Sequence, residues 1–115
     1  MQPYKEIPKA ELDESIMITK LLNNRIRLQL IYLLEQHEYN VTELSKILDV
    51  EQTNLSHQLS LLKTHQIISQ RREGKLMYYQ IDDPHIIETM TALLQHAKHV
   101  ANGKPYVNRR VRKRD

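Results

Sequence analysis

The sequence contains no cysteine, and this absence excludes several classes of protein. Disulfide bonds, thiolate zinc fingers, iron–sulfur clusters and cysteine nucleophiles all require a thiol. Any metal site must therefore be built from histidine, aspartate or glutamate side chains. No apolar run approaches the roughly 18 residues of a membrane-spanning helix, and the stretch from Met1 to Glu14 lacks the apolar core of a secretory signal peptide. We therefore expect a cytoplasmic protein with no membrane partner.

Glycine and proline are also scarce, with two glycines and four prolines in 115 residues. Between Lys9 and Asp83 the only residue of either kind is Gly74, so helices can run with few interruptions. Apolar side chains recur at helical spacing in four segments, which predicts amphipathic helices over residues 10–22, 25–36, 41–48 and 51–65. A last helix is expected from His85 to Ala101, with Pro84 before it and Gly103 at its end.

The two central helices have the organisation of a helix-turn-helix. Asn40 and Glu43 are spaced as a capping box at the start of the first, and a turn at Asp49-Val50 leads into the second. That second helix has leucines on one face and small polar side chains on the other. Two β-prone runs, 67–70 and 76–81, flank a basic turn over 71–75 and predict a hairpin. The expected fold class is mainly α with a small β-hairpin wing.

Positive charge is concentrated in two segments, although the net charge is only +3. Residues 52–80 contain four Lys or Arg and one acid, and residues 103–115 contain six and one, whereas the other segments are net acidic. A polyanion would be attracted to these two basic segments. We expect one domain over residues 1–102 and a flexible basic tail over 103–115, which either adds phosphate contacts or has no role.

Side chains suited to DNA binding lie on both elements of the predicted winged helix-turn-helix. An α-helix fits the major groove, where polar side chains meet base edges. Cations on a wing can hold phosphates or enter the minor groove. The alternative is that these side chains only keep the surface soluble. The predicted base contacts are Gln52, Thr53, Ser56 and His57, and the predicted wing contacts are Arg71, Arg72 and Lys75.

Three of the six histidines lie on the last predicted helix, and Asp83 precedes it. At 100° per residue, His85, His96 and His99 point to one side of that helix. His85 and His96 are nevertheless about 16 Å apart along the axis, too far to share a zinc ion that binds nitrogen at about 2.1 Å. Two antiparallel copies would bring Asp83 and His85 of one chain to His96 and His99 of the other, giving two identical sites.

Three imidazoles and a carboxylate form a ligand set that suits zinc or cobalt. The same residues also fit a helix cap followed by a polar stripe near a helix end, with no metal at all. From spacing alone, both interpretations stay open.

The sequence resembles the ArsR/SmtB family of winged-helix repressors over residues 10–102. The segments that carry the resemblance are NRIRLQLIYLL and VTELSKILDVEQTNLSHQLSLLK, followed by the wing and the final helix in the same order. The resemblance implies a homodimer paired through its first and last helices, which binds operator DNA and leaves it when metal binds. Zinc-responsive efflux repressors of this family place their Asp-His-His-His ligands at the spacing of residues 83, 85, 96 and 99. The lack of cysteine departs from many relatives and removes thiolate sensing of arsenic, lead and cadmium.

These observations predict a metal-responsive transcriptional repressor that binds double-stranded operator DNA as a homodimer and is released by Zn2+ or Co2+, with nickel left open. One alternative is a winged-helix DNA-binding regulator that metal does not control. Another is a small zinc hydrolase, which is disfavoured because four protein ligands close the zinc shell to substrate. We therefore expect no enzymatic activity and no small organic substrate.

Overall fold

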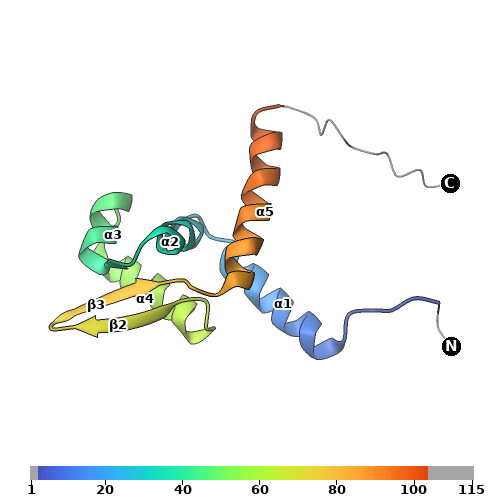
Figure 1. Ribbon diagram of the computed structural model, residues 1–115, viewed down its shortest axis with the longest axis horizontal. Helices are drawn as coiled ribbons and strands as arrows, with labels where there is room; N and C mark the ends of the chain where they lie inside the picture. The colour runs from blue at the N-terminus through green and yellow to red at the C-terminus, as the bar shows by residue number, and fades with distance from the viewer. Residues whose placement is uncertain (1–2, 104–115) are drawn as a thin grey trace. The chain divides into compact units, whose positions relative to one another are not determined.

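The computed structural model describes residues 3–103 (Figure 1). The elements in chain order are α1 (Lys9–Leu22), α2 (Arg25–Gln36), β1 (Tyr39–Asn40), α3 (Val41–Leu48), α4 (Gln52–Thr64), β2 (Ser69–Glu73), β3 (Leu76–Gln80) and α5 (Pro84–Ala101). A division between Asp83 and Pro84 separates two compact units, of which the first holds α1 to β3 and the second holds α5. The predicted fold class is confirmed. The predicted domain over 1–102 stays a prediction, and residues 104–115 of the predicted tail lie outside the described residues.

Asparagine caps begin the second and third helices where the sequence predicted them. The Asn24 side chain accepts a hydrogen bond of 3.0 Å from the Arg27 backbone N–H at the start of α2. At the start of α3, Asn40 accepts from the Glu43 N–H and Glu43 accepts from the Asn40 N–H, both at 2.9 Å. This reciprocal capping box satisfies two donors that the first turn of a helix leaves without partners.

The turn between α3 and α4 is made without glycine. Asp49 ends α3 in the left-handed conformation, with φ of 55°. The Val50 N–H then donates to the Ser45 carbonyl at 3.3 Å, and the Ser45 hydroxyl donates back to the Val50 carbonyl at 2.6 Å. These two hydrogen bonds close the turn, so that α4 starts at Gln52 and the helix-turn-helix is formed as predicted.

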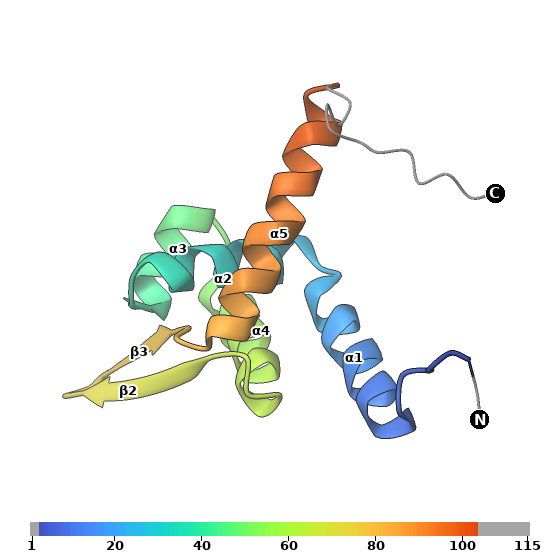
Figure 2. The same ribbon diagram turned by 45° about the vertical axis from the view of Figure 1, so that its right-hand side comes forward.

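Leucine and isoleucine side chains of α2, α3 and α4 form the core of the first unit; Figure 2 shows the three helices as ribbons. Their apolar faces meet because each helix has a buried stripe at three- and four-residue spacing. At the edge of this core, the Ile81 N–H donates to the Leu34 carbonyl at 3.1 Å, which joins the end of the sheet to α2. The fully buried side chains are Leu30, Ile31, Leu34, Leu44, Leu55, Leu59 and Leu62.

The sheet of the first unit has three antiparallel strands in the order β1-β3-β2. The predicted strand over 67–70 coincides with β2 only at its last two residues. Ile67 and Ile68 are buried core residues that precede the strand, and β2 runs on to Glu73. The turn is only Gly74-Lys75, with φ of 64° at the glycine. A positive φ at the first central residue is the pattern of a type II′ turn, which matches the twist of the flanking strands.

The second unit contains α5, which runs without interruption from Pro84 to Ala101. Proline opens the helix, as expected from its fixed φ. At the other end, the Gly103 N–H donates to the Val100 carbonyl at 3.0 Å and Gly103 has φ of 66°, so glycine ends this helix as predicted. Within residues 3–103, no helix combines the length and the hydropathy that crossing a bilayer requires.

Candidate functional site

The four residues predicted to contact bases lie in the first two turns of α4. Their side chains are exposed, while Leu55, Leu59 and Leu62 of the same helix are buried. Burial of the leucine face therefore leaves the polar face available for a ligand. The Gln52 amide also lies 3.5 Å from the Thr42 hydroxyl of α3. The exposed set is Gln52, Thr53, Ser56 and His57.

A half-buried arginine of α2 connects α4 to the end of α1. Arg27 Nε donates to the Leu21 carbonyl at 2.6 Å, and Nη2 lies 3.4 Å from the Lys20 carbonyl. Arg27 Nη1 donates to Gln58 Oε1 on α4 at 2.7 Å, and Gln58 in turn donates to Asn54 at 3.1 Å. The Arg27 guanidinium thus bonds both to the last carbonyls of α1 and to the Gln58 side chain of α4. The helix dipole favours a cation at the carbonyl end of α1.

The β2–β3 hairpin carries the three predicted wing residues, and its tip projects beyond the helices of the first unit in both ribbon views (Figures 1 and 2). Sequence reasoning placed all three in the turn. Arg71 and Arg72 instead belong to β2, and only Lys75 lies in the turn. Because side chains alternate along a strand, Arg71 and Arg72 point to opposite faces of the hairpin.

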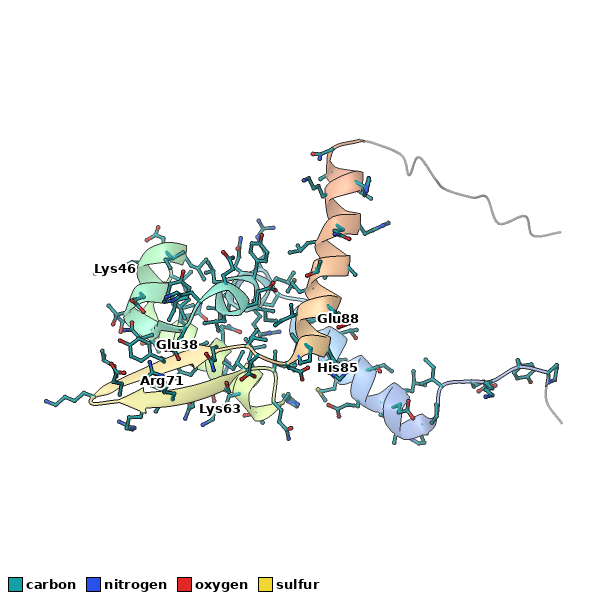
Figure 3. The ribbon with its side chains drawn as sticks, viewed as in Figure 1. Glu38, Lys46, Lys63, Arg71, His85 and Glu88 are labelled. Atoms are coloured by element: carbon teal, nitrogen blue, oxygen red, sulfur yellow. The ribbon has the colours of Figure 1, made fainter. Side chains whose placement is uncertain are left out.

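Arg71 differs from the other two wing cations because carboxylates surround it (Figure 3). Its guanidinium donates to both oxygens of Glu38, at 2.6 and 3.0 Å, and to Glu73 at 2.7 Å. No local signal in the sequence pointed to Glu38, which is 33 residues away along the chain. The hydrogen bonds of Arg27 and Gln58, 31 residues apart, were missed for the same reason.

The predicted metal ligands lie on and just before α5, with His85 in its first turn (Figure 3). Because α5 is continuous, the axial distance of about 16 Å between His85 and His96 holds for the folded chain. Among residues 3–103 of a single chain, no three His, Asp or Glu side chains come together in a way that could hold a metal ion. The ligand set of Asp83, His85, His96 and His99 therefore stays a prediction that needs a second copy.

Comparison with known proteins places this geometry in a family. The family model described as "Bacterial regulatory protein, arsR family" matches residues 24–70, which include the helix-turn-helix. A cadmium resistance transcriptional regulatory protein CadC homolog from Staphylococcus aureus is 30% identical over 99 residues, covering 85% of this chain and 82% of the relative. The chain belongs to the arsR family. A biofilm growth-associated repressor from Agrobacterium fabrum is 34% identical, covering 76% of this chain and 79% of that protein.

A solved structure agrees with the arsR-family fold. The homodimeric winged helix-turn-helix DNA-binding domain of a possible ArsR-family regulator from Mycobacterium bovis superposes with a TM-score of 0.74 at 28% identity, covering 86% of this chain and 92% of that one. As an arsR-family protein, the chain is a transcriptional regulator and not an enzyme. The resemblance stated from the sequence is thereby confirmed at the level of the family.

Proposed function

We propose that this arsR-family protein is a repressor that binds operator DNA as a homodimer and is released when zinc or cobalt binds between the subunits. The observation that carries the proposal is the continuous α5 with histidines near both of its ends. Within the family, the ligand spacing is similar to that of the zinc-responsive efflux repressor CzrA. We also propose a cytoplasmic location, which the proposed DNA binding supports.

The proposed DNA interface consists of the exposed face of α4 and the wing. Short polar side chains at the start of α4 can exchange hydrogen bonds with base edges in the major groove. Arg72 and Lys75 supply charge for phosphates, and residues 52–80 as a whole have a net charge of +3. The name of the Mycobacterium bovis relative, a DNA-binding domain, supports this assignment.

The proposed dimer interface consists of α1 and α5. Both helices expose large apolar side chains, including Leu12 and Ile16 on α1 and Leu93 and Leu94 on α5. Apolar patches of this kind are uncommon on a monomer and are typical of protein contacts. The Mycobacterium bovis relative is described as homodimeric, which supports a second copy as the partner.

The proposed metal site combines Asp83 and His85 of one subunit with His96 and His99 of the other. Three imidazole nitrogens and one carboxylate oxygen fit the preferences of zinc and cobalt. Metal chemistry at this fold is supported by the name of the Staphylococcus aureus relative, a cadmium resistance regulator. In this chain, however, the absence of cysteine favours a nitrogen and oxygen site over a thiolate one.

The deciding experiment compares operator affinity with saturating zinc and with a chelator at one salt concentration. The operator is first recovered by selecting duplexes from a random-sequence library with the purified protein. We expect zinc to weaken binding by an allosteric coupling of about 1 to 3 kcal/mol, and operator DNA to weaken zinc binding equally. His65→Ala, outside α5, is the control that should respond like wild type. Equal affinities, or tighter binding with zinc, would contradict release by metal.

A mixing experiment tests whether two subunits share the site. One subunit carries Asp83→Ala and His85→Ala, and the other carries His96→Ala and His99→Ala. Neither homodimer should bind zinc tightly, whereas the heterodimer should recover one site because each chain supplies the pair that its partner lacks. A verified heterodimer with no tight site would exclude the shared arrangement.

The alternative function is a winged-helix regulator that no metal controls. This alternative is supported by the name of the Agrobacterium fabrum relative, a biofilm growth-associated repressor, which mentions no metal. Equilibrium dialysis with zinc separates the two, because the alternative requires no tight zinc site in the intact dimer.

A further inference from the structure

The Arg71 side chain extends across the whole sheet of the first unit. Arg71 is paired with Tyr78 of the central strand β3, and its guanidinium carbon lies 5.0 Å from the centre of the Tyr78 ring. Beyond that ring it reaches Glu38, the residue that directly precedes β1. The contacts of Arg71 with Tyr78, Glu38 and Glu73 are called the wing strap below.

The wing strap uses all three nitrogens of the Arg71 side chain. Nε and Nη2 donate to the two oxygens of Glu38 as a bidentate pair, and Nη1 donates to Glu73. Bidentate arginine–carboxylate pairs are shorter and stronger than single ion pairs. The Glu38 side chain is 27% exposed and the Arg71 side chain 46%, so solvent partly screens the pair and its strength comes mainly from the bidentate geometry. A DNA phosphate would have to displace Glu38 before it could take the same donors.

Charge strengthens the strap throughout the pH range of a DNA-binding assay. Hydrogen bonding from Arg71 lowers the pKa of Glu38 below its ordinary value of 4.5. The two carboxylates in turn raise the pKa of Arg71. A carboxylate with a lowered pKa contributes stability above its unfolded pKa and loses it only as the pH falls through the folded one. The pair of Arg71 and Glu38 is therefore charged at neutral pH.

The strap joins the wing to the start of the helix-turn-helix. Glu38 stands two residues before Asn40, whose side chain caps α3. Arg71 stands in the outer strand β2, whose backbone pairs with β3. The guanidinium is thus a direct connection from the outer strand of the wing to the segment that enters α3.

We infer that Arg71 is a positioning residue that orients the wing, and that the phosphate contacts of the wing come from Arg72 and Lys75. This inference rests on the proposed DNA-binding function. It replaces the sequence-based expectation that all three cations bind phosphate. Arg72 lies on the opposite face of the hairpin from the strap, beside Met77, and Lys75 lies at the tip.

The first test uses a substitution for which the two roles predict opposite signs. Glu38→Gln removes a negative charge, so simple electrostatics predicts tighter binding to a mixed-sequence DNA duplex. Loss of the strap instead predicts binding that is several-fold weaker, measured by fluorescence anisotropy well below the melting temperature of the variant. Tighter or unchanged binding by Glu38→Gln would overturn the inference.

The second test reads phosphate contacts directly from the salt dependence of the same binding. Arg72→Gln should reduce the slope of log affinity against log salt by about 0.9 for its lost phosphate contact. Arg71→Gln and Arg71→Lys should both weaken binding with no such change in slope. The two variants should have similar affinities, because lysine keeps the positive charge but cannot form the bidentate hydrogen bonds of the guanidinium. A slope reduced by Arg71→Gln and restored by Arg71→Lys would identify a phosphate ligand instead.

A third measurement needs no DNA and keeps failure of the strap distinct from failure of the proposed function. Amide hydrogen exchange of β2 and β3 should speed up in Glu38→Gln and in Arg71→Gln. The double variant should exchange no faster than Arg71→Gln, because that substitution already removes the contact with Glu38. Arg72→Gln should leave exchange unchanged. Unchanged exchange in both strap variants would overturn the inference even if the protein binds DNA as proposed.

Discussion

Replacing Arg27 by methionine should destabilise the protein more than any single cap substitution. Methionine keeps the length and the apolar part of the half-buried side chain but removes all three side-chain donors. Two of the lost hydrogen bonds are short, at 2.6 and 2.7 Å, and each comes from a charged donor. Hydrogen bonds to charged groups contribute about 1.5 to 3 kcal/mol. Because both bonds belong to one group and do not add fully, we expect a loss of about 2 to 4 kcal/mol.

Urea unfolding at one fixed protein concentration measures this loss, since the stability of a dimer depends on concentration. Asn24→Ala is the matched control at the same helix start: it removes only the cap on the Arg27 backbone N–H and should cost about 1 kcal/mol. A cycle with Gln58→Leu isolates the bond between α2 and α4, with an expected coupling of about 1 kcal/mol. If Arg27→Met cost no more than Asn24→Ala, the guanidinium would not hold α1 and α4 together.

Three further predictions test other parts of the structure. Gln66→Gly should stabilise the protein by up to about 1 kcal/mol in thermal unfolding. Gln66 has φ of 60°, and the backbone strain that glycine relieves there exceeds the free energy lost through the greater entropy of the unfolded chain. Destabilisation by this substitution would contradict the reasoning. Asn40→Ala should cost about 1 to 2 kcal/mol in urea, since it opens a capping box at a buried position, and a loss below 0.5 kcal/mol would argue that water replaces the cap. Gln52→Ala should reduce operator binding by about 1 to 3 kcal/mol while leaving mixed-sequence binding unchanged, whereas Arg72→Ala should weaken both; an unchanged ratio for Gln52→Ala would show that the base-contacting face lies elsewhere.

Local signals explain which parts of the fold could be predicted from the sequence. Helices α2 and α3 are capped by Asn24 and Asn40, whose hydrogen bonds reach only three residues along the chain and are visible in the sequence. The two-residue strand β1 was missed because it exists only through its pairing with Tyr78 and Tyr79, far along the chain. The hairpin was predicted with too long a turn, since charged residues such as Arg71 were assigned to the turn rather than to an exposed strand.

The candidate site likewise has features that the sequence predicts and features that depend on distant contacts. Exposure of the polar face of α4 follows from the leucine spacing, so the structure agrees with the sequence there. The partners of Arg71 and Arg27 depend on contacts across more than 30 residues, which no periodicity reveals. The metal ligands depend on a second chain, so a single sequence indicates them only by spacing and family resemblance.

The outer position of β2 also bears on how this protein avoids aggregation. An unpaired sheet edge offers backbone hydrogen-bonding groups to any passing strand, and proteins protect such edges with charge. Every residue of β2 is exposed, and Arg71, Arg72 and Glu73 form three consecutive charges along it. Substitutions that replace these charges with β-prone apolar residues would therefore favour edge-to-edge association of wings. The charge of this strand is constrained by colloidal stability as well as by any nucleic-acid partner, which limits how freely the wing sequence can diverge.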